Sequence, residues 1–177
     1  AGPSPGVPTK TEQADLWQAL GASQGDFQRL IVAPTDALDA FNTLPEIFNL
    51  VDKYQCPGIV ISDLLISEGT FSVDPALLDM HPKIDRGELI TEPSSTDGYK
   101  RYKNTESGIS PRALPGLEGY VHIVATDEHD EDGVLISDEF TNPHKRRMMV
   151  EKRARKFKDI EKAIAAPQLE GPEDAQV

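Results

Sequence analysis

The first third of the chain alternates between helical and strand-like hydrophobic patterns. Residues 30–33 and 58–63 are short apolar runs bounded by proline or glycine, which is typical of buried parallel strands. Apolar residues recur at helical spacing over residues 41–51, between the two runs. A further helix is predicted from Thr9 to about Gly21. Helix, strand, helix and strand with short connections predict an α/β fold with parallel strands and right-handed crossovers.

Both predicted helices carry start signals. Thr9 and Glu12 have the spacing of a capping box, in which each side chain bonds the backbone at the other's position. Thr35 is placed to cap the second helix, and Pro45 inside its pattern should kink or divide it. The residues of this helix expected to face the core are Phe41, Leu44, Ile47, Phe48 and Val51.

The pattern changes at about residue 67. Residues from there to about 118 hold many glycines, prolines, serines and charges and few periodic apolar positions, which predicts a long irregular arm over 74–119. Such an arm is either a functional excursion or a segment that lies on a partner. Residues 120–124 alternate between apolar and polar side chains and predict a strand.

A last helix is predicted from an asparagine cap at Asn142, with Pro143 at the first helical position, to about Ile164. This helix is dense in lysine and arginine, and its apolar stripe is expected to lie against the body or a partner. The stripe consists of Met149, Val150, Phe157, Ile160 and Ile164. Residues 167–177 are acidic and show no periodicity.

The charge of the chain limits its partners. A formal net charge of −12 argues against nucleic acid or an anionic membrane, because both would be repelled. Cys56 is the single cysteine, so no disulfide within the chain and no cysteine motif for zinc or an iron–sulfur cluster exists. No run of eighteen apolar residues is present, as a membrane span would require. These features favour a reducing cytoplasm as the location.

The turn before the first helix is the best candidate for an anion site. Free amides and the helix dipole favour a negative group there, and glycines such as Gly6 allow the backbone to approach it closely. Thr9 either caps the helix or also binds the anion, and one hydroxyl can do both. Ser4 either donates to the anion or holds the turn, and the turn is the preferred interpretation.

Several motifs in one order resemble the alpha subunit of 2-oxoacid:ferredoxin oxidoreductases. The family pattern GPSxGxPT followed by xxEQxDL is matched by residues 2–16. Further similar motifs occur downstream at family-like spacing, namely Phe48-Asn49-Leu50, Ile61-Ser62-Asp63, Tyr99-Lys100-Arg101-Tyr102, Gly108-Ile109-Ser110-Pro111-Arg112 and Glu128-His129-Asp130-Glu131. Several motifs in order are more specific than any one of them.

The resemblance implies a domain organisation. The family's YPITP-type motif, and a glutamate that contacts the thiamine aminopyrimidine ring, both lie upstream of GPSxGxPT. The chain is therefore expected to supply the second half of a pyrimidine-type domain (1–73) and the interdomain arm (74–119). A strand and basic helix (120–166) and a linker (167–177) towards a second alpha domain would come after the arm.

The resemblance also implies a reaction, which is oxidative decarboxylation of a 2-oxoacid to an acyl-coenzyme A with reduction of ferredoxin. Thiamine diphosphate and Mg²⁺ would lie mainly on a partner beta subunit, which also holds a [4Fe–4S] cluster, and coenzyme A is a co-substrate. The family's substrate-recognising threonine corresponds to Thr9, with Ser4 and Gly6 beside it in the same motif. The chain would act as an enzyme only within that assembly.

The arm carries a basic, aromatic segment. Lys100, Arg101 and Arg112 could contact a neighbouring subunit or the phosphates of coenzyme A. The alternative is a domain linker that packs on its own chain. The linker role is preferred, and a contact with a neighbouring subunit is expected in addition.

Other candidate residues have simpler interpretations. His129 lies within an acidic turn whose spacing matches neither a zinc nor a calcium motif. Asp63 ends a predicted strand and is expected to cap the next element of the chain, and Cys56 is expected to be a small buried hydrophobe. Two other functions stay open: a non-catalytic binding or assembly module that docks a partner subunit, and a plain acidic α/β fold without a ligand.

Overall fold

The computed structural model describes most of the chain in several segments. They are residues 15–25, 27–93, 98–124, 127–135, 142–165, 171–172 and 174. The helices are α1 (Leu16–Gly21), α2 (Ala37–Tyr54), α3 (Leu64–Glu68) and α4 (Pro143–Arg155), with short 3₁₀ turns η1 (Pro75–Leu77) and η3 (Ile160–Lys162). The strands are β1 (Leu30–Val32), β2 (Gly58–Val60), β3 (Leu89–Ile90) and β4 (Arg112–Ala113).

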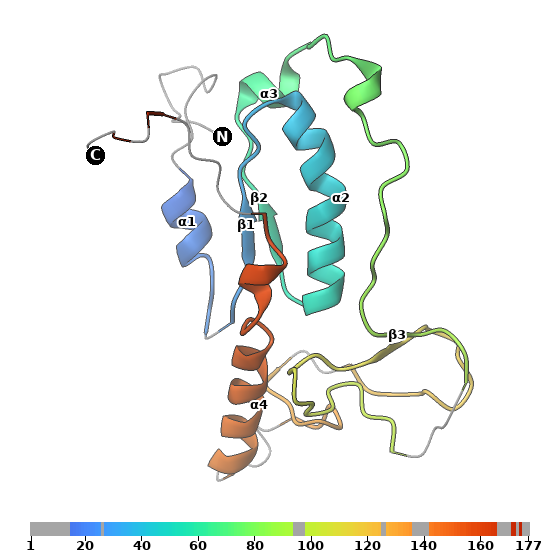
Figure 1. The fold of residues 1–177 in the computed structure, drawn as a ribbon. Coiled ribbons are helices and arrows are strands. Elements are labelled where there is room, and N and C mark those ends of the chain that lie inside the picture. Colours follow the sequence, from blue (N-terminus) through green and yellow to red (C-terminus); the bar gives the residue numbers. More distant parts are fainter. Residues whose placement is uncertain are drawn as a thin grey trace.

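The predicted parallel pair is confirmed. β1 and β2 pair in parallel with Ile31 opposite Ile59, and α1 and α2 lie on opposite sides of the pair in Figure 1. The strands are shorter than the apolar runs predicted. They are also less buried than expected, since only Leu30 is fully buried in β1 and both ends of β2 are exposed.

The sequence predicted that Pro45 would kink or divide helix α2. Division is wrong, because α2 is continuous through Pro45. Proline removes only its own amide bond to the carbonyl of Phe41, four residues earlier. Ile47 and Leu50, just beyond Pro45, are buried against the core, and this packing holds the second half of the helix in line with the first.

The predicted cap of α2 is displaced by one residue. Asp36, not Thr35, is the N-cap, and its Oδ1 accepts a hydrogen bond of 2.8 Å from Asp39 N. Thr35 instead donates its amide and its hydroxyl to Asp39 Oδ2, at 2.9 and 3.2 Å. Asp36 and Asp39 thus each accept a backbone amide at the start of the helix. The bond from the Thr35 amide lowers the pKa of Asp39.

The core lies between α2, β1 and the C-terminal turn. Its buried members are Leu30, Ile47, Leu50, Tyr54 and Ile160. Three of the five α2 residues expected to face the core do not, since Phe41, Leu44 and Phe48 form an outward stripe and Phe48 is 72% exposed. Helical periodicity finds apolar faces, but it does not identify the one that packs on the chain's own core.

The predicted strand at residues 120–124 is not formed. Tyr120 is buried edge-on against Tyr99, with ring centroids 4.9 Å apart, whereas Val121 is 95% exposed. Alternating side chains alone do not make a strand without a neighbour to pair with.

The last helix is shorter than predicted. α4 ends at Arg155, and the chain continues through turns to η3. Met149 and Ile160, from the predicted apolar stripe, are buried, but Ile164 is largely exposed. Lys152 is also buried, on a helix expected to keep its charges in solvent.

The arm is irregular over most of its length, as predicted, and in Figure 1 it runs beside α2 before it reaches α4. It contains one short parallel pair, β3 with β4, in which Leu89 lies opposite Arg112. Within the described residues, no helix combines the length and the hydrophobicity needed to cross a bilayer.

Candidate functional site

The two strands of the parallel pair, β1 and β2, end at the same edge of the sheet. After β1 and β2 finish, the Ile61 amide still donates to the Val32 carbonyl at 2.8 Å, and both chains then turn into helices. Ligands of open parallel sheets bind outside the carboxyl ends of the strands. This edge is therefore where a site is expected.

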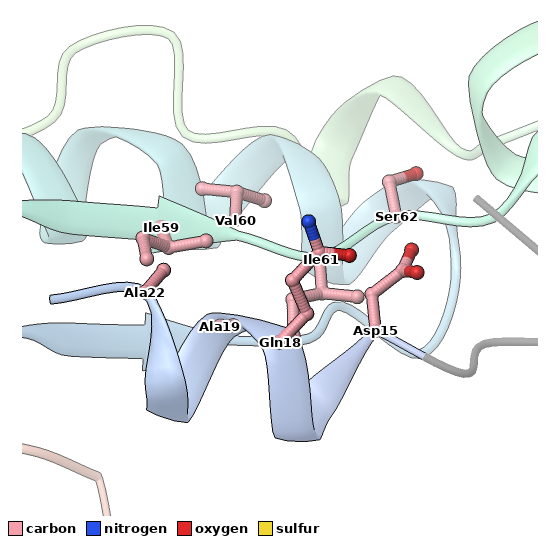
Figure 2. Close-up of a pocket in the computed structure, with 8 residues that line it drawn as sticks. All are labelled: Asp15, Gln18, Ala19, Ala22, Ile59, Val60, Ile61 and Ser62. Carbon is pink, nitrogen blue, oxygen red and sulfur yellow. The ribbon is translucent and has the colours of Figure 1, made fainter.

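A groove of about 480 Å³ lies between α1 and β2 at this edge. Figure 2 shows Asp15 and Ser62 at one end of the groove, with Ala22 and Ile59 at the other. The amide of Gln18 reaches across it beside Ile61. The groove thus combines an apolar lining with a polar end at the carboxyl end of β2.

The polar end is locally well defined. Ser62 Oγ lies 2.9 Å from Ser67 Oγ and 3.2 Å from the Asp63 carbonyl oxygen. Asp63 is the N-cap of α3, with its Oδ1 accepting from Ile66 N at 2.8 Å. The prediction that Asp63 caps the element after its strand is confirmed.

A larger cavity of about 690 Å³ lies between β1, α2 and η3. Its wall includes the buried core residues Leu30, Ile47 and Ile160. This cavity is therefore part of the hydrophobic core, and the groove at the strand ends is the better candidate for ligand binding.

The residues predicted to bind substrate, Ser4, Gly6 and Thr9, lie outside the described residues, as does Glu12. The prediction of one helix from Thr9 to about Gly21 is wrong, because α1 begins at Leu16 with Asp15 as its N-cap. The segment that contains Ser4, Gly6 and Thr9 joins the described chain at Asp15, which lines the polar end of the groove. The role of these residues stays a prediction.

Of the three arm cations, Lys100 and Arg101 bind groups of their own chain. Lys100 Nζ pairs with Asp132 Oδ2 at 3.0 Å, which raises the pKa of Lys100. Arg101 Nη1 donates to Gln55 Oε1 at 3.2 Å, and its guanidinium also lies over the Tyr102 ring. These contacts place the segment on its own chain, as the linker interpretation expects.

Arg112, the third arm cation, meets Arg86 at a shared carboxylate. Asp52 accepts from Arg86 Nε at 2.7 Å and pairs with Arg112 Nη2 at 3.2 Å. The bond from Arg86 is the main cause that holds the pKa of Asp52 below its usual value, and the bond from Arg112 acts in the same direction. Arg112 Nε is buried without a partner among the described residues.

The residue that organises this region is Gln55, which the sequence analysis did not identify. It ends α2 in a left-handed conformation with φ of 51°. Its Nε2 donates to the Ser110 carbonyl at 2.6 Å, and its own carbonyl accepts from Lys156 Nζ at 2.8 Å. Gln55 thus joins α2, the arm and the residues after α4. The only signal was its place directly after a helix, where a left-handed residue is common but is usually glycine or asparagine.

The acidic turn around His129 is held together by Asp130. Asp130 Oδ1 accepts from the amides of Asp132 and Val134 at 3.0 and 3.1 Å, and Oδ2 pairs with Lys145 Nζ at 3.1 Å. The His129 ring stacks on Tyr102, with centroids 3.8 Å apart. No group of three potential metal ligands occurs among the residues that the structure describes.

Replacing Asp130 with asparagine should lower stability at neutral pH by about 1–3 kcal/mol, because it removes the buried negative charge that pairs with Lys145. Burial acts to raise the pKa of Asp130, but the bonds from Lys145 and the two amides hold it below its ordinary value of 3.8. A lowered pKa stabilises the fold above that value, and the contribution is lost as pH falls through the folded-state pKa. Unfolding measured from neutral to acidic pH should show the difference between variant and parent shrinking.

The control is Asp132→Asn, which removes only the more exposed pair with Lys100. It should change stability by less than about 1 kcal/mol. Equal effects of the two substitutions would show that Asp130 does not organise the turn.

Cys56 is partly buried against the core, as predicted for a small hydrophobe. Burial raises the pKa of its thiol, which keeps it protonated and unreactive at neutral pH.

Comparisons with known proteins give the chain a context. Residues 1–151 match the family described as pyruvate flavodoxin/ferredoxin oxidoreductase, thiamine diphosphate-binding. The alpha subunit of 2-oxoacid:ferredoxin oxidoreductase 2 from Aeropyrum pernix is 36% identical over 100% of this chain, and the Saccharolobus solfataricus alpha subunit is 37% identical over 99%. The chain spans only 27% and 26% of these relatives, about a quarter of their length.

A solved structure agrees with the sequence matches. It is a 2-oxoglutarate:ferredoxin oxidoreductase from Magnetococcus marinus with 2-oxoglutarate, coenzyme A and succinyl-CoA bound. The match has a TM-score of 0.75 and 31% identity, and it covers 97% of this chain and 29% of that one. The match supports the α/β fold class of a thiamine diphosphate-binding domain that the sequence predicted.

Proposed function

Because the chain belongs to the thiamine diphosphate-binding pyruvate flavodoxin/ferredoxin oxidoreductase family, we propose that it is part of the alpha subunit of a 2-oxoacid:ferredoxin oxidoreductase. In this role the assembled enzyme decarboxylates a 2-oxoacid, transfers the acyl group to coenzyme A and passes the electrons to ferredoxin. The chain contributes the wall of the active site that contacts the 2-oxoacid and the pyrimidine side of the cofactor.

The observation that carries this proposal is the position of the groove between α1 and β2. It opens at the carboxyl end of β2, and Asp15 at its polar end directly follows the segment that contains Ser4, Gly6 and Thr9. A 2-oxoacid has a carboxylate at one end and a carbon chain at the other. The amides and hydroxyls of residues 2–9 would bind the carboxylate, and the apolar lining would accept the chain.

The groove fits a substrate better than it fits a diphosphate with its metal. Asp15 is the one ionisable residue in its lining, so the described wall offers neither cations for phosphate nor a set of Mg²⁺ ligands. We therefore place the diphosphate, Mg²⁺ and the [4Fe–4S] cluster on the beta subunit. Thiamine diphosphate supplies the carbanion chemistry when bound. The residues of this chain orient the 2-oxoacid and exclude water from one side of it.

The arm is proposed to act mainly as a bracket within its own chain. Arg101 bonds Gln55 and Arg112 pairs with Asp52, so both cations contact their own chain. The Lys100 side chain is 35% exposed and stays the best of the three for a contact with coenzyme A or a neighbouring subunit.

One face of α1 supports association with other parts of the assembly. Leu16, Trp17 and Leu20 point away from the core, and Trp17 is 82% exposed. An exposed apolar cluster of this kind marks an interaction surface. The same face favours the second candidate, a docking module without a catalytic role, in a cytoplasmic assembly. A 2-oxoacid-dependent dye-reduction assay separates the two functions.

Gln18 provides a direct test of the groove, because its amide crosses it. In the full-length, assembled enzyme, Gln18→Trp should raise KM for the 2-oxoacid by about tenfold, because filling a site with a larger side chain costs about 1–3 kcal/mol. Steady-state kinetics with a dye acceptor measure this effect.

The matched control is Gln18→Ala, which leaves the groove open and should change KM by less than about threefold. Melting temperatures of both variants should stay close to that of the parent, since the side chain is exposed. If tryptophan and alanine give the same KM, the groove does not receive the substrate.

A further inference from the structure

Three cations converge on the C-terminal end of α2. Lys156 Nζ donates to the Gln55 carbonyl at 2.8 Å, and Arg101 Nη1 donates to Gln55 Oε1 at 3.2 Å. Lys152 lies one helical turn before Lys156, so their side chains share a face of the chain. We call Arg101, Lys152 and Lys156 the Gln55 cation cluster.

Lys152 is the unusual member of the cluster. The residue is only 4% exposed, and no negatively charged group is among the described residues that shift the pKa of its ammonium. The pKa of Lys152 is lowered to about 8, and burial is the largest cause. The other causes are the positive charges of Lys156, Arg101, Arg153 and Arg155. Lysine is rarely buried unless it is paired, and here every charged neighbour that acts on it is also positive.

The other members do not supply the missing negative charge. Both hydrogen bonds of the cluster go to neutral amide oxygens of Gln55, and Arg153 is already paired with Glu128 at 2.9 Å. Burial also lowers the pKa of Lys156 and of Arg101. The described structure therefore gathers three buried or half-buried cations without a counter-ion.

We propose that the Gln55 cation cluster is a binding site for an oxyanion, with Lys152 as its central ligand. A guanidinium and two ammonium groups together offer more donors than Gln55 uses, and they match the oxygens of a phosphate or a carboxylate. An anion there would supply the negative partner that Lys152 lacks and remove the repulsion among the cations. The site is independent of the groove between α1 and β2, and it holds whether or not the groove binds a 2-oxoacid.

The oxyanion has two sources that one experiment distinguishes. In the full-length, assembled protein, site-resolved labelling with an amine-reactive reagent, read by mass spectrometry across a range of pH, reports the apparent pKa of Lys152. The probe is inorganic phosphate, compared with chloride at equal ionic strength. Lys158, exposed and near the start of η3, is the internal control.

If the anion comes from solution, Lys152 should titrate near pH 8 in chloride. Phosphate should then slow its labelling at neutral pH by about tenfold, a rise of about one pKa unit, and leave Lys158 unchanged. If a carboxylate elsewhere in the assembly occupies the site, Lys152 should titrate in the ordinary range of a lysine even in chloride. A low pKa that phosphate does not move, or an equal response of Lys158, would overturn the proposal.

Substitution provides a second readout. With an anion from solution, phosphate should raise the melting temperature of the parent and of Lys158→Met, but not that of Lys152→Met. With a built-in carboxylate, Lys152→Met should be less stable than the parent in any buffer, because it leaves that carboxylate unpaired. A Lys152→Met variant that is more stable than the parent in both salts would show that no anion binds.

Discussion

Replacing Thr9 with alanine in the assembled enzyme is expected to raise KM for the 2-oxoacid by about tenfold or more. A hydrogen bond from a hydroxyl to a carboxylate contributes about 1.5–3 kcal/mol, and every 1.4 kcal/mol is a factor of ten in affinity. The bond is made to the carboxylate that leaves as CO2 and loses its charge in the bond-breaking step, so the bond stabilises the bound substrate at least as much as the transition state. We therefore expect KM to change much more than kcat.

Thr9→Ser is the matched control, because it keeps the hydroxyl and should hold KM within about threefold of the parent. Thr11→Ala, two residues further along, controls for a general effect on the segment that precedes α1. Loss of a helix cap alone would lower the melting temperature by an amount that corresponds to about 1 kcal/mol. A lower melting temperature of Thr9→Ala with unchanged KM would leave Thr9 as a cap only.

Gly108→Ala should release the arm from α4. Gly108 has φ of +79°, and a Cβ there would collide with the carbonyl oxygen of Lys152 and lie 3.0 Å from the amide nitrogen of Lys156. Backbone atoms of a helix end cannot move aside without breaking helical bonds. We expect the substitution to lower the local stability of the contact by about 3 kcal/mol or more, which combines backbone strain with the clash.

Hydrogen–deuterium exchange measures this effect within the whole assembly, because it reports the free energy of local opening. Exchange over residues 103–110 should accelerate by about a hundredfold. The control is Gly116→Ala, whose φ of +90° carries a similar strain but whose Cβ would meet nothing within 4 Å. It should cost about 1–2 kcal/mol and leave residues 103–110 protected. Equal exchange in both variants would mean that the arm does not pack on α4.

The parallel pair was predictable because its signal is local. The runs at 30–33 and 58–63 are apolar, they are bounded by proline or glycine, and a helical pattern separates them. Chirality and chain length then leave few ways to connect them. The start of α2 was found within one residue, and the choice between Thr35 and Asp36 as its cap depends on backbone angles that sequence does not specify.

The wrong predictions share a cause, which is dependence on distant neighbours. Residues 120–124 alternate like a strand, yet Tyr120 packs on Tyr99 and no strand pairs with its neighbours. Phe48 has a helical spacing that suggests the core, but the packing of α2 turns it outward. In each case the local pattern was correct as a propensity, and tertiary packing determined the outcome.

The candidate site was predictable only in part. The strand-end rule points to the carboxyl end of β2, where Ser62 and Asp63 lie and a groove is present. That Gln18 lines the groove could not be predicted, because it depends on the angle between α1 and the sheet. Gln55 and Lys152 were missed because their surroundings depend on contacts between distant segments, such as the bond of Lys156 to Gln55, 101 residues earlier.

The central claim is that the chain presents residues 2–9 to the carboxylate of a 2-oxoacid at the groove between α1 and β2. A structure of the full-length enzyme, assembled with its partner subunit and with the 2-oxoacid bound, tests it directly. The account predicts the substrate carboxylate within about 3 Å of donors from this segment, Thr9 among them, and its carbon chain beside Gln18 and Ile61. A substrate bound elsewhere, with this groove filled by side chains of the protein itself, would contradict it.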